Sequence, residues 1–273
     1  MQSGSMDIYL AKLIKAINYC NTQILNPSEY YAIKAVFNHF RDKEDGYEKL
    51  TVENLANESA FSQASISRFI KKIGYDSFQE FRMSFHNARQ RLLERRGSHV
   101  EHLYGRDAKT AVDTRYQQAV DNLTKTYQSF DLPGYERIVR QMLSASSVTF
   151  ISDDLGLSLF FTLQLDLIAC GIPVFLFKNI EVQKEHSQSL GKDDLVIFLN
   201  ADAGFTTDEQ WGIFRHLHGK TRLIGFFQDR RPDLQKLFDE CIFYGAEGSV
   251  HDGFYSLFLI SRIFSDLIHM AQS

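Results

Sequence analysis

Amide, hydroxyl and cationic side chains recur on one face of a helix predicted between Ser62 and Gly74. Its apolar residues, at helical spacing, are Ile66, Phe69, Ile70 and Ile73. The other positions carry Gln63, Ala64, Ser65, Ser67, Arg68, Lys71 and Lys72. An amide can bind adenine through two hydrogen bonds, hydroxyls can contact bases or phosphates, and cations hold phosphates. The pattern therefore predicts a helix that enters the major groove of DNA.

A second, shorter helix is predicted just before it, over residues 52–58. Thr51 can cap the first helix and Ser62 the second, because a hydroxyl can accept an unpaired amide of the first turn. Phe61 is placed to act as a hydrophobic staple, and Gly74 is a natural stop. The two helices predict a helix–turn–helix corner, the alternative being an ordinary helical hairpin with solvated charges.

The distribution of charge favours the DNA-binding interpretation. Residues 1–106 contain 15 Lys or Arg and 12 Asp or Glu, a balance of +3, whereas residues 107–273 contain 15 and 22, a balance of −7. From Ser62 to Arg96 there are 8 basic and 3 acidic residues. Positive charge is concentrated where a duplex would need it, in an otherwise acidic chain.

Residues 50–81, LTVENLANESAFSQASISRFIKKIGYDSFQEF, resemble the N-terminal domain of RpiR-type bacterial transcriptional regulators. The matching residues are Leu55, Ala56, Ser62, Ser67, Arg68, Phe69, Gly74, Tyr75, Phe78 and Phe81. The resemblance implies binding to operator DNA and control of carbohydrate metabolism genes. Ala60 departs from the family, which usually has glycine in the turn; we expect a shifted turn geometry but an intact corner.

Two domains follow from the length and the hydrophobic patterns. We predict an all-α helix–turn–helix domain over residues 6–96, and a polar linker over 97–115. The helices of the first domain are expected at 7–25, 28–41, 52–58, 62–73 and 77–96.

From residue 116 to 273 short apolar runs alternate with helical patterns, which predicts an α/β domain with a doubly wound parallel sheet. The strands are expected at 148–152, 172–177, 194–200, 222–227 and 241–245. The helices are expected at 116–129, 133–144, 157–170, 180–189, 206–218, 232–238 and 252–270.

In such a sheet ligands bind where strands end and helices begin, which draws attention to loops 152–158 and 200–207. Their architecture resembles the SIS (sugar isomerase) domain, with matches at Gly156, Ser158, Gly204 and Thr206. The resemblance implies the motifs GxGxS and SxSGxT, which bind phosphosugars. This chain departs from them with an acid at the first glycine position, Asp154, and with alanine at both serine positions, Ala201 and Ala203.

Three interpretations of this altered site compete. Ser158, Thr206 and Thr207 could hold a phosphate with adjacent helix amides. A changed pocket could instead take a neutral or cationic metabolite through Asp154, Asp202 or Glu247. In the third interpretation the pocket is empty and the domain serves only for association, with Ser158 and Thr206 acting as helix caps.

Catalysis and metal binding are not expected. Glu247 has no paired base, and neither the His216–His218 nor the His99–His102 pair has the carboxylate of a metal motif. We therefore expect no enzyme activity, no cofactor and no metal. The rivals are a phosphosugar isomerase with an added helical domain, and an association module or adaptor that never touches DNA.

The remaining expectations concern partners and compartment. The cysteines, Cys20, Cys170 and Cys241, are scattered and lack metal spacing, which is typical of a reducing compartment. No stretch approaches 18 uninterrupted apolar residues, so we expect a cytoplasmic protein without a membrane partner. The final helix is apolar on more than one face, which favours a homodimer or homotetramer. We expect operator DNA and a sugar phosphate or another small metabolite as the partners.

Overall fold

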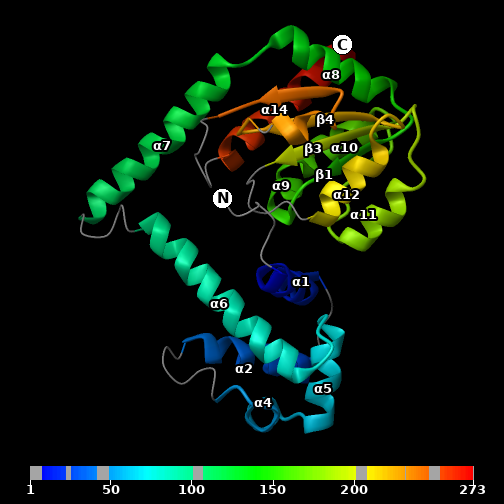
Figure 1. Cartoon of the computed structure of the whole chain (residues 1–273). Coiled ribbons are helices and arrows are strands. Elements are labelled where there is room, and N and C mark those ends of the chain that lie inside the picture. Colours follow the sequence, from blue (N-terminus) through cyan, green and yellow to red (C-terminus); the bar gives the residue numbers. More distant parts are fainter. Residues whose placement is uncertain are drawn as a thin grey trace. The chain divides into compact units, whose positions relative to one another are not determined.

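The computed structural model describes residues 8–22, 26–41, 49–100, 107–200, 208–230, 232–245 and 253–272. The chain divides into two compact units, a helical unit over residues 6–106 and an α/β unit over residues 107–273. Figure 1 shows helices in the first unit and a sheet covered by helices in the second.

The helical unit is built around one apolar core. Its described helices are α1 (Ile8–Thr22), α2 (Pro27–Arg41), α4 (Val52–Ser59), α5 (Gln63–Lys72) and α6 (Phe78–Val100). Helix α1 packs against α6, α2 against α4, and α5 against both α4 and α6. The apolar stripe of each helix supplies this core, for example Leu13, Leu55, Ile66 and Phe81. The predicted all-helical first domain is confirmed.

The α/β unit contains a five-stranded parallel sheet. Its strands, in spatial order, are β2 (Val174–Phe175), β1 (Val148–Ile151), β3 (Leu195–Asn200), β4 (Arg222–Phe227) and β5 (Glu240–Phe243). Each neighbouring pair is parallel. The sheet order reverses direction between β1 and β3, and this switch point is where doubly wound sheets bind ligands.

Helices cover both faces of the sheet. They are α7 (Ala108–Gln128), α8 (Leu132–Ser144), α9 (Asp154–Leu159), α10 (Phe161–Ala169), α11 (Ile180–Ser187), α12 (Asp208–Leu217), α13 (Pro232–Gln235) and α14 (Gly253–Gln272). Phe150 lies in a core with α8, α10 and α14, whereas Phe198 lies in a second core with α12. Because both faces are buried, the central strands are continuous apolar runs. The predicted doubly wound α/β fold is confirmed.

Two local predictions are corrected. The helix expected at 157–170 is two helices, α9 and α10, separated at Phe160. Much of the polar segment expected as a linker, 97–115, is helical, since α6 reaches Val100 and α7 begins at Ala108. The Asp107 side chain accepts a hydrogen bond from the Thr110 amide and so caps α7. Its first turns are polar because they are largely exposed, and this polarity had suggested a linker.

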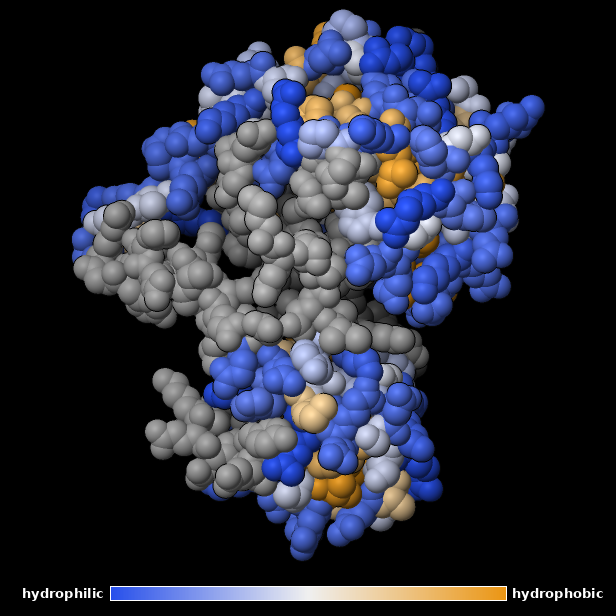
Figure 2. All heavy atoms as spheres, in the orientation of Figure 1, coloured by the Kyte–Doolittle hydropathy of each residue, from blue (hydrophilic) through white to orange (hydrophobic). Residues whose placement is uncertain are grey.

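Helix α14 is long and apolar enough, by length and composition, to cross a membrane. In this fold it is a core helix, because Leu257, Ile260, Phe264 and Ile268 are buried against the sheet and its neighbouring helices. Figure 2 shows that the visible face of each unit is mainly hydrophilic, with apolar residues in small areas. The apolar character of α14 therefore reflects the core of the α/β unit.

Candidate DNA-binding helix and ligand edge

Both predicted caps of the helix–turn–helix corner are confirmed. The Thr51 hydroxyl accepts a hydrogen bond from the Asn54 amide at 3.1 Å, and the Ser62 hydroxyl accepts one from the Ser65 amide at 3.2 Å. Ala60 between the helices has φ 58° and ψ 24°, the left-handed conformation. This conformation costs a residue with a Cβ atom roughly 1–2 kcal/mol. The corner therefore persists with alanine in a conformation that favours glycine.

Helix α5 ends in two further hydrogen bonds that fix its exit. Gly74, with φ 101°, donates its amide to the Lys71 carbonyl at 3.1 Å. The Tyr75 amide donates to the Ile70 carbonyl at 3.2 Å. This pair of bonds is the Schellman motif, in which glycine supplies the left-handed residue. The predicted stop at Gly74 is confirmed.

The polar face predicted for α5 is turned to solvent. The exposed members are Gln63, Ala64, Ser67, Arg68, Lys71 and Lys72, whereas Ser65 is half-buried. The opposite stripe, Ile66, Phe69 and Ile70, is buried in the helical core. Helix α5 therefore presents amide, hydroxyl and cationic groups on one side while its other side is anchored.

A chain of hydrogen bonds crosses the first turns of α5. The Ser62 and Ser65 hydroxyls lie 3.0 Å apart, and Arg68 Nη2 donates to the Ser65 hydroxyl at 3.0 Å. Ser67 donates to the Gln63 carbonyl at 3.1 Å. The Ser65 hydroxyl is thus already engaged with Arg68, and it holds the guanidinium against the helix.

Lys72 makes a contact that sequence reasoning missed. Its Nζ donates to Glu29 Oε1 at 2.8 Å, and the Glu29 side chain is only 8% exposed. The hydrogen bond from Lys72 is the main reason that the pKa of the Glu29 carboxyl is lowered. The Asn-Pro-Ser-Glu segment could have indicated a capping glutamate at position 29, but the partner 43 residues away could not be read from it.

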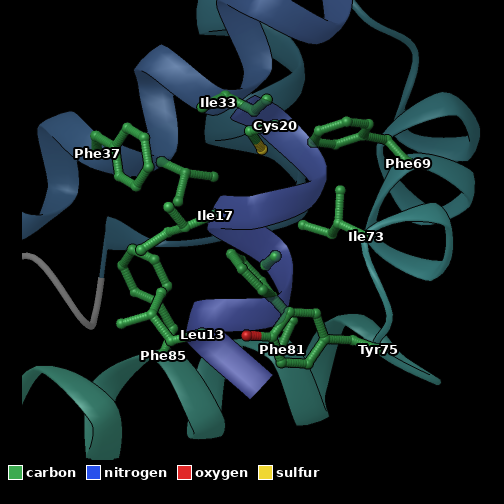
Figure 3. A pocket seen from close by; sticks show the side chains of 12 residues that line it. Leu13, Ile17, Cys20, Ile33, Phe37, Phe69, Ile73, Tyr75, Phe81 and Phe85 are labelled. Atoms are coloured by element: carbon green, nitrogen blue, oxygen red, sulfur yellow. The ribbon is translucent and has the colours of Figure 1, made fainter. Parts of the chain in front are cut away.

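A small apolar pocket lies inside the helical unit (Figure 3). It is lined by residues of α1, α2, α5 and α6, including Phe69 and Ile73 of the DNA-binding candidate. Its volume of about 20 Å³ is close to that needed by one water molecule, and its walls are almost entirely apolar. This pocket is too small for a metabolite and marks imperfect core packing.

At the C-terminal ends of the strands, the end of β1 is held by buried hydrogen bonds. The Ser152 hydroxyl donates to the Leu199 carbonyl at 2.6 Å, and the Gln210 side chain donates to the Ser152 carbonyl at 3.1 Å. Asp153 Oδ1 accepts the Gly156 amide at 2.8 Å and caps α9. The Asp153 carboxylate thus has a structural role at the start of this helix.

Ser158 lies exposed on α9, close to a cation that the sequence analysis did not select. Lys178 Nζ donates to the Ser158 hydroxyl at 3.3 Å. Lys178 follows β2, and the next residue, Asn179, caps α11 by accepting the Glu181 amide at 2.8 Å. The sequence could have indicated Lys178 as a ligand-binding candidate. It comes directly after a predicted strand, and ligands bind at the C-terminal ends of the strands in such a sheet.

The other predicted ligand residues cannot be placed. Asp202, Thr206, Thr207 and Glu247 lie outside the described residues, and of Asp154 only the backbone, which begins α9, is described. Their roles stay predictions. Asn200 at the end of β3 is described: it is 6% exposed, and its carbonyl accepts the Tyr244 hydroxyl at 2.7 Å. Buried polar groups therefore approach the switch point from both β1 and β3.

Comparison with known families identifies the helical unit. Residues 20–91 match the family model described as "Helix-turn-helix domain, rpiR family". An uncharacterized HTH-type transcriptional regulator of Clostridium perfringens is 21% identical over 248 residues, which cover 86% of each chain. An uncharacterized HTH-type transcriptional regulator of Providencia stuartii is 21% identical over 165 residues, covering 59% of this chain and 56% of the relative.

Solved structures match the fold of both units. The Vibrio vulnificus NanR protein, complexed with ManNAc-6P, has a TM-score of 0.52 at 15% identity and covers 95% of this chain and 92% of its own. A phosphoheptose isomerase from Francisella tularensis has a TM-score of 0.50 at 11% identity and covers 60% of this chain and 100% of its own. Residues 20–91 are therefore an RpiR-family helix–turn–helix domain, in a chain that is similar over most of its length to an HTH-type transcriptional regulator. The α/β unit that follows this domain has the fold of these solved structures.

Proposed function

We propose that α5 is the recognition helix of this regulator. Gln63, Ala64 and Ser67 would face base edges, Arg68 would contact guanine or phosphate with Ser65 behind it, and Lys71 would hold phosphate. The single observation that carries the proposal is the exposed polar face of a helix that is capped at both ends and anchored by a buried stripe. Such a helix can enter the major groove without rearrangement.

DNA selection with the full-length protein tests this assignment. A duplex is selected from a randomised pool, and its binding is measured by fluorescence anisotropy over a KCl series. Arg68→Ala and Lys71→Ala should weaken binding, and loss of one phosphate contact should reduce the salt slope by about 0.9. Lys192→Ala, an exposed cation in the α/β unit, is the matched control and should leave binding unchanged.

Gln63→Ala distinguishes base-specific recognition from binding that does not depend on the DNA sequence. If Gln63 bonds a base edge, its loss should relax the preference at one position of the selected duplex by roughly 1–3 kcal/mol. Equal weakening on every sequence would show that Gln63 is not a base reader. No effect of any α5 substitution would remove the recognition-helix assignment.

A second proposed function is the binding of an anionic sugar at the C-terminal edge of the sheet. Lys178 beside Ser158 supports it, because a cation and a hydroxyl at this edge suit a phosphate group. Thr206 and Thr207 would complete the site. Among solved structures of similar fold, NanR holds ManNAc-6P. A metabolite held by Asp154, Asp202 or Glu247, and a domain used only for association, are the competing outcomes.

Thermal shift of the full chain distinguishes these outcomes. Sugar phosphates should raise the melting temperature, while the matching neutral sugars should not. Lys178→Ala should abolish the shift, whereas Lys192→Ala should preserve it. Equal stabilisation by neutral sugars would favour the altered pocket, and no stabilisation by either group would favour association alone. Incubation with aldose and ketose phosphates should give no isomerisation, since we propose a regulator without enzyme activity.

The outer faces of α10 and α14 support self-association of the chain. They expose large apolar side chains, namely Phe161, Leu165 and Ile168 on α10, and Tyr255 and Phe258 on α14. Exposed apolar groups on packed neighbouring helices are typical of subunit interfaces. We propose a homodimer formed through these helices. Phe258→Arg should give monomers in sedimentation, and an unchanged sedimentation coefficient would contradict the assignment.

A further inference from the structure

Lys72 differs from its neighbour Lys71 although both are exposed cations at the end of α5. The ammonium group of Lys72 lies 2.8 Å from Glu29 Oε1 and 5.8 Å from the centre of the Tyr19 ring. Within the described part of the chain, Lys71 has no ion pair. The contacts of Lys72 thus tie α5 to both α1 and α2.

The two oxygens of the Glu29 carboxylate accept hydrogen bonds from different helices. Its Oε2 accepts the Asn26 amide at 3.1 Å, and the Glu29 amide donates to Asn26 Oδ1 at 2.9 Å. These reciprocal bonds form a capping box at the start of α2. The other oxygen, Oε1, accepts a hydrogen bond from Lys72 Nζ. The capping box of α2 therefore holds the carboxylate independently of its contact with α5.

Burial makes the loss of this pairing costly for Glu29. Its side chain is 8% exposed, whereas the Lys72 side chain is 51% exposed. A buried carboxylate without a partner is strongly disfavoured, so the pair cannot be broken without penalty. A phosphate that drew Lys72 away would leave the Glu29 carboxylate with only the hydrogen bond from the Asn26 amide. Lys71 carries no such constraint within the described structure.

We propose that Lys72 is a positioning residue, which sets the orientation of the recognition helix through Glu29 rather than neutralising a DNA phosphate. The inference rests on the proposed function, in which α5 enters the major groove. It replaces the sequence-based expectation that Lys72 is one of the phosphate contacts. Under this assignment the Lys72–Glu29 pair fixes the end of α5, while Arg68 and Lys71 make the contacts.

Substitution of each partner distinguishes the two roles. Glu29→Gln keeps the oxygen that accepts the Asn26 amide but releases Lys72. If Lys72 positions α5, both Glu29→Gln and Lys72→Met should weaken DNA binding by about twofold to 150-fold, the range of coupling within one ion-pair network. The double variant should bind no more weakly than either single variant. Lys72→Arg should restore most of the affinity, because it keeps the ion pair.

The salt dependence of binding provides a readout that a phosphate contact would change. Lys72→Met should leave the slope of log affinity against log salt unchanged, whereas Lys71→Met should reduce it by about 0.9. Glu53→Gln, an exposed acid of α4, controls for the general effect of removing negative charge. Far-UV circular dichroism and melting temperature establish that each variant is folded.

Three outcomes would overturn the proposal: tighter binding by Glu29→Gln beyond the Glu53→Gln control, a reduced slope in Lys72→Met, or no effect of Lys72→Met. If Glu29→Gln does not fold, the comparison of Lys71→Met with Lys72→Met still decides between the roles. Unchanged binding by Arg68→Ala and Lys71→Met would instead show that the recognition-helix assignment itself is wrong.

Discussion

The helix–turn–helix corner and the ligand edge of the sheet differ in how their parts come together. Every cap, turn and stop of the corner lies between Thr51 and Tyr75 and is made by residues three to five positions apart. The described edge joins Lys178, which follows β2, to Ser158 of α9, and Ser152 at the end of β1 to the Leu199 carbonyl of β3. The corner can be recognised from the spacing of residues in the sequence. A site at the C-terminal ends of the strands can be recognised only when the spatial order of the strands is known.

Core truncation should have the largest effect and tests whether the two units are independent. Ile66 in the helical unit and Ile197 in the sheet are both fully buried. Replacing either with alanine should cost about 2–5 kcal/mol. The single tryptophan, Trp211, lies in the α/β unit, so its fluorescence reports unfolding there. Ile197→Ala should shift that transition and Ile66→Ala should not; equal shifts would show that the units unfold together.

Removal of the cap of α5 tests how much of the corner depends on local bonds. Ser62→Ala deletes the hydroxyl that accepts the Ser65 amide and should cost about 1 kcal/mol of stability in the helical unit. Hydrogen exchange of the α5 amides measures the loss. Ser67→Ala is the matched control, because its exposed hydroxyl bonds a carbonyl already used within the helix. Equal protection in both variants would mean that the cap is dispensable.

Restoring glycine in the turn should strengthen the corner slightly. Ala60→Gly relieves roughly 1–2 kcal/mol of left-handed strain and adds about 0.4–1 kcal/mol of chain entropy to the unfolded state, a net gain below about 1.5 kcal/mol. Ala64→Gly, on the exposed face of α5, should instead destabilise by about 1 kcal/mol. Chemical denaturation followed by circular dichroism measures both. Destabilisation by Ala60→Gly would show that the alanine methyl group has a packing role.

Acidification should separate the two units by the pH at which each weakens. Burial lowers the pKa of His186 in the α/β unit, whose Nε2 lies 3.0 Å from the Thr149 hydroxyl. Because the unfolded chain takes up this proton first, the α/β unit should lose stability as pH falls below 6.5. The lowered pKa of Glu29 acts on the helical unit only below 4.5.

His186→Gln tests this smallest effect. Glutamine can still bond Thr149 but does not titrate, so the decline of the Trp211 transition between pH 7 and 5.5 should flatten. An unchanged pH profile in this variant would assign the decline to other groups. If both units lost stability over the same pH range, the predicted difference between them would be wrong.

The fold could be predicted largely from sequence, because helical and strand periodicities and turn residues are local. The errors arose where a local signal was ambiguous. The polar run near Ala108 is an exposed helix with an aspartate cap, and Phe160 interrupts a pattern that looked continuous. Site prediction was less complete, because Lys178 and Glu29 gain their roles from partners 20 and 43 residues away.

The sequence alone determined the corner, its caps and its outward polar face, since backbone capping and helical spacing act over three to five residues. Only the tertiary structure decided which cation at the end of α5 pairs with a buried carboxylate. Lys71 and Lys72 are adjacent and chemically identical, yet the packing of α1 and α2 brings a buried carboxylate to Lys72. A buried charge must be paired, and the choice of its partner depends on how the helices pack.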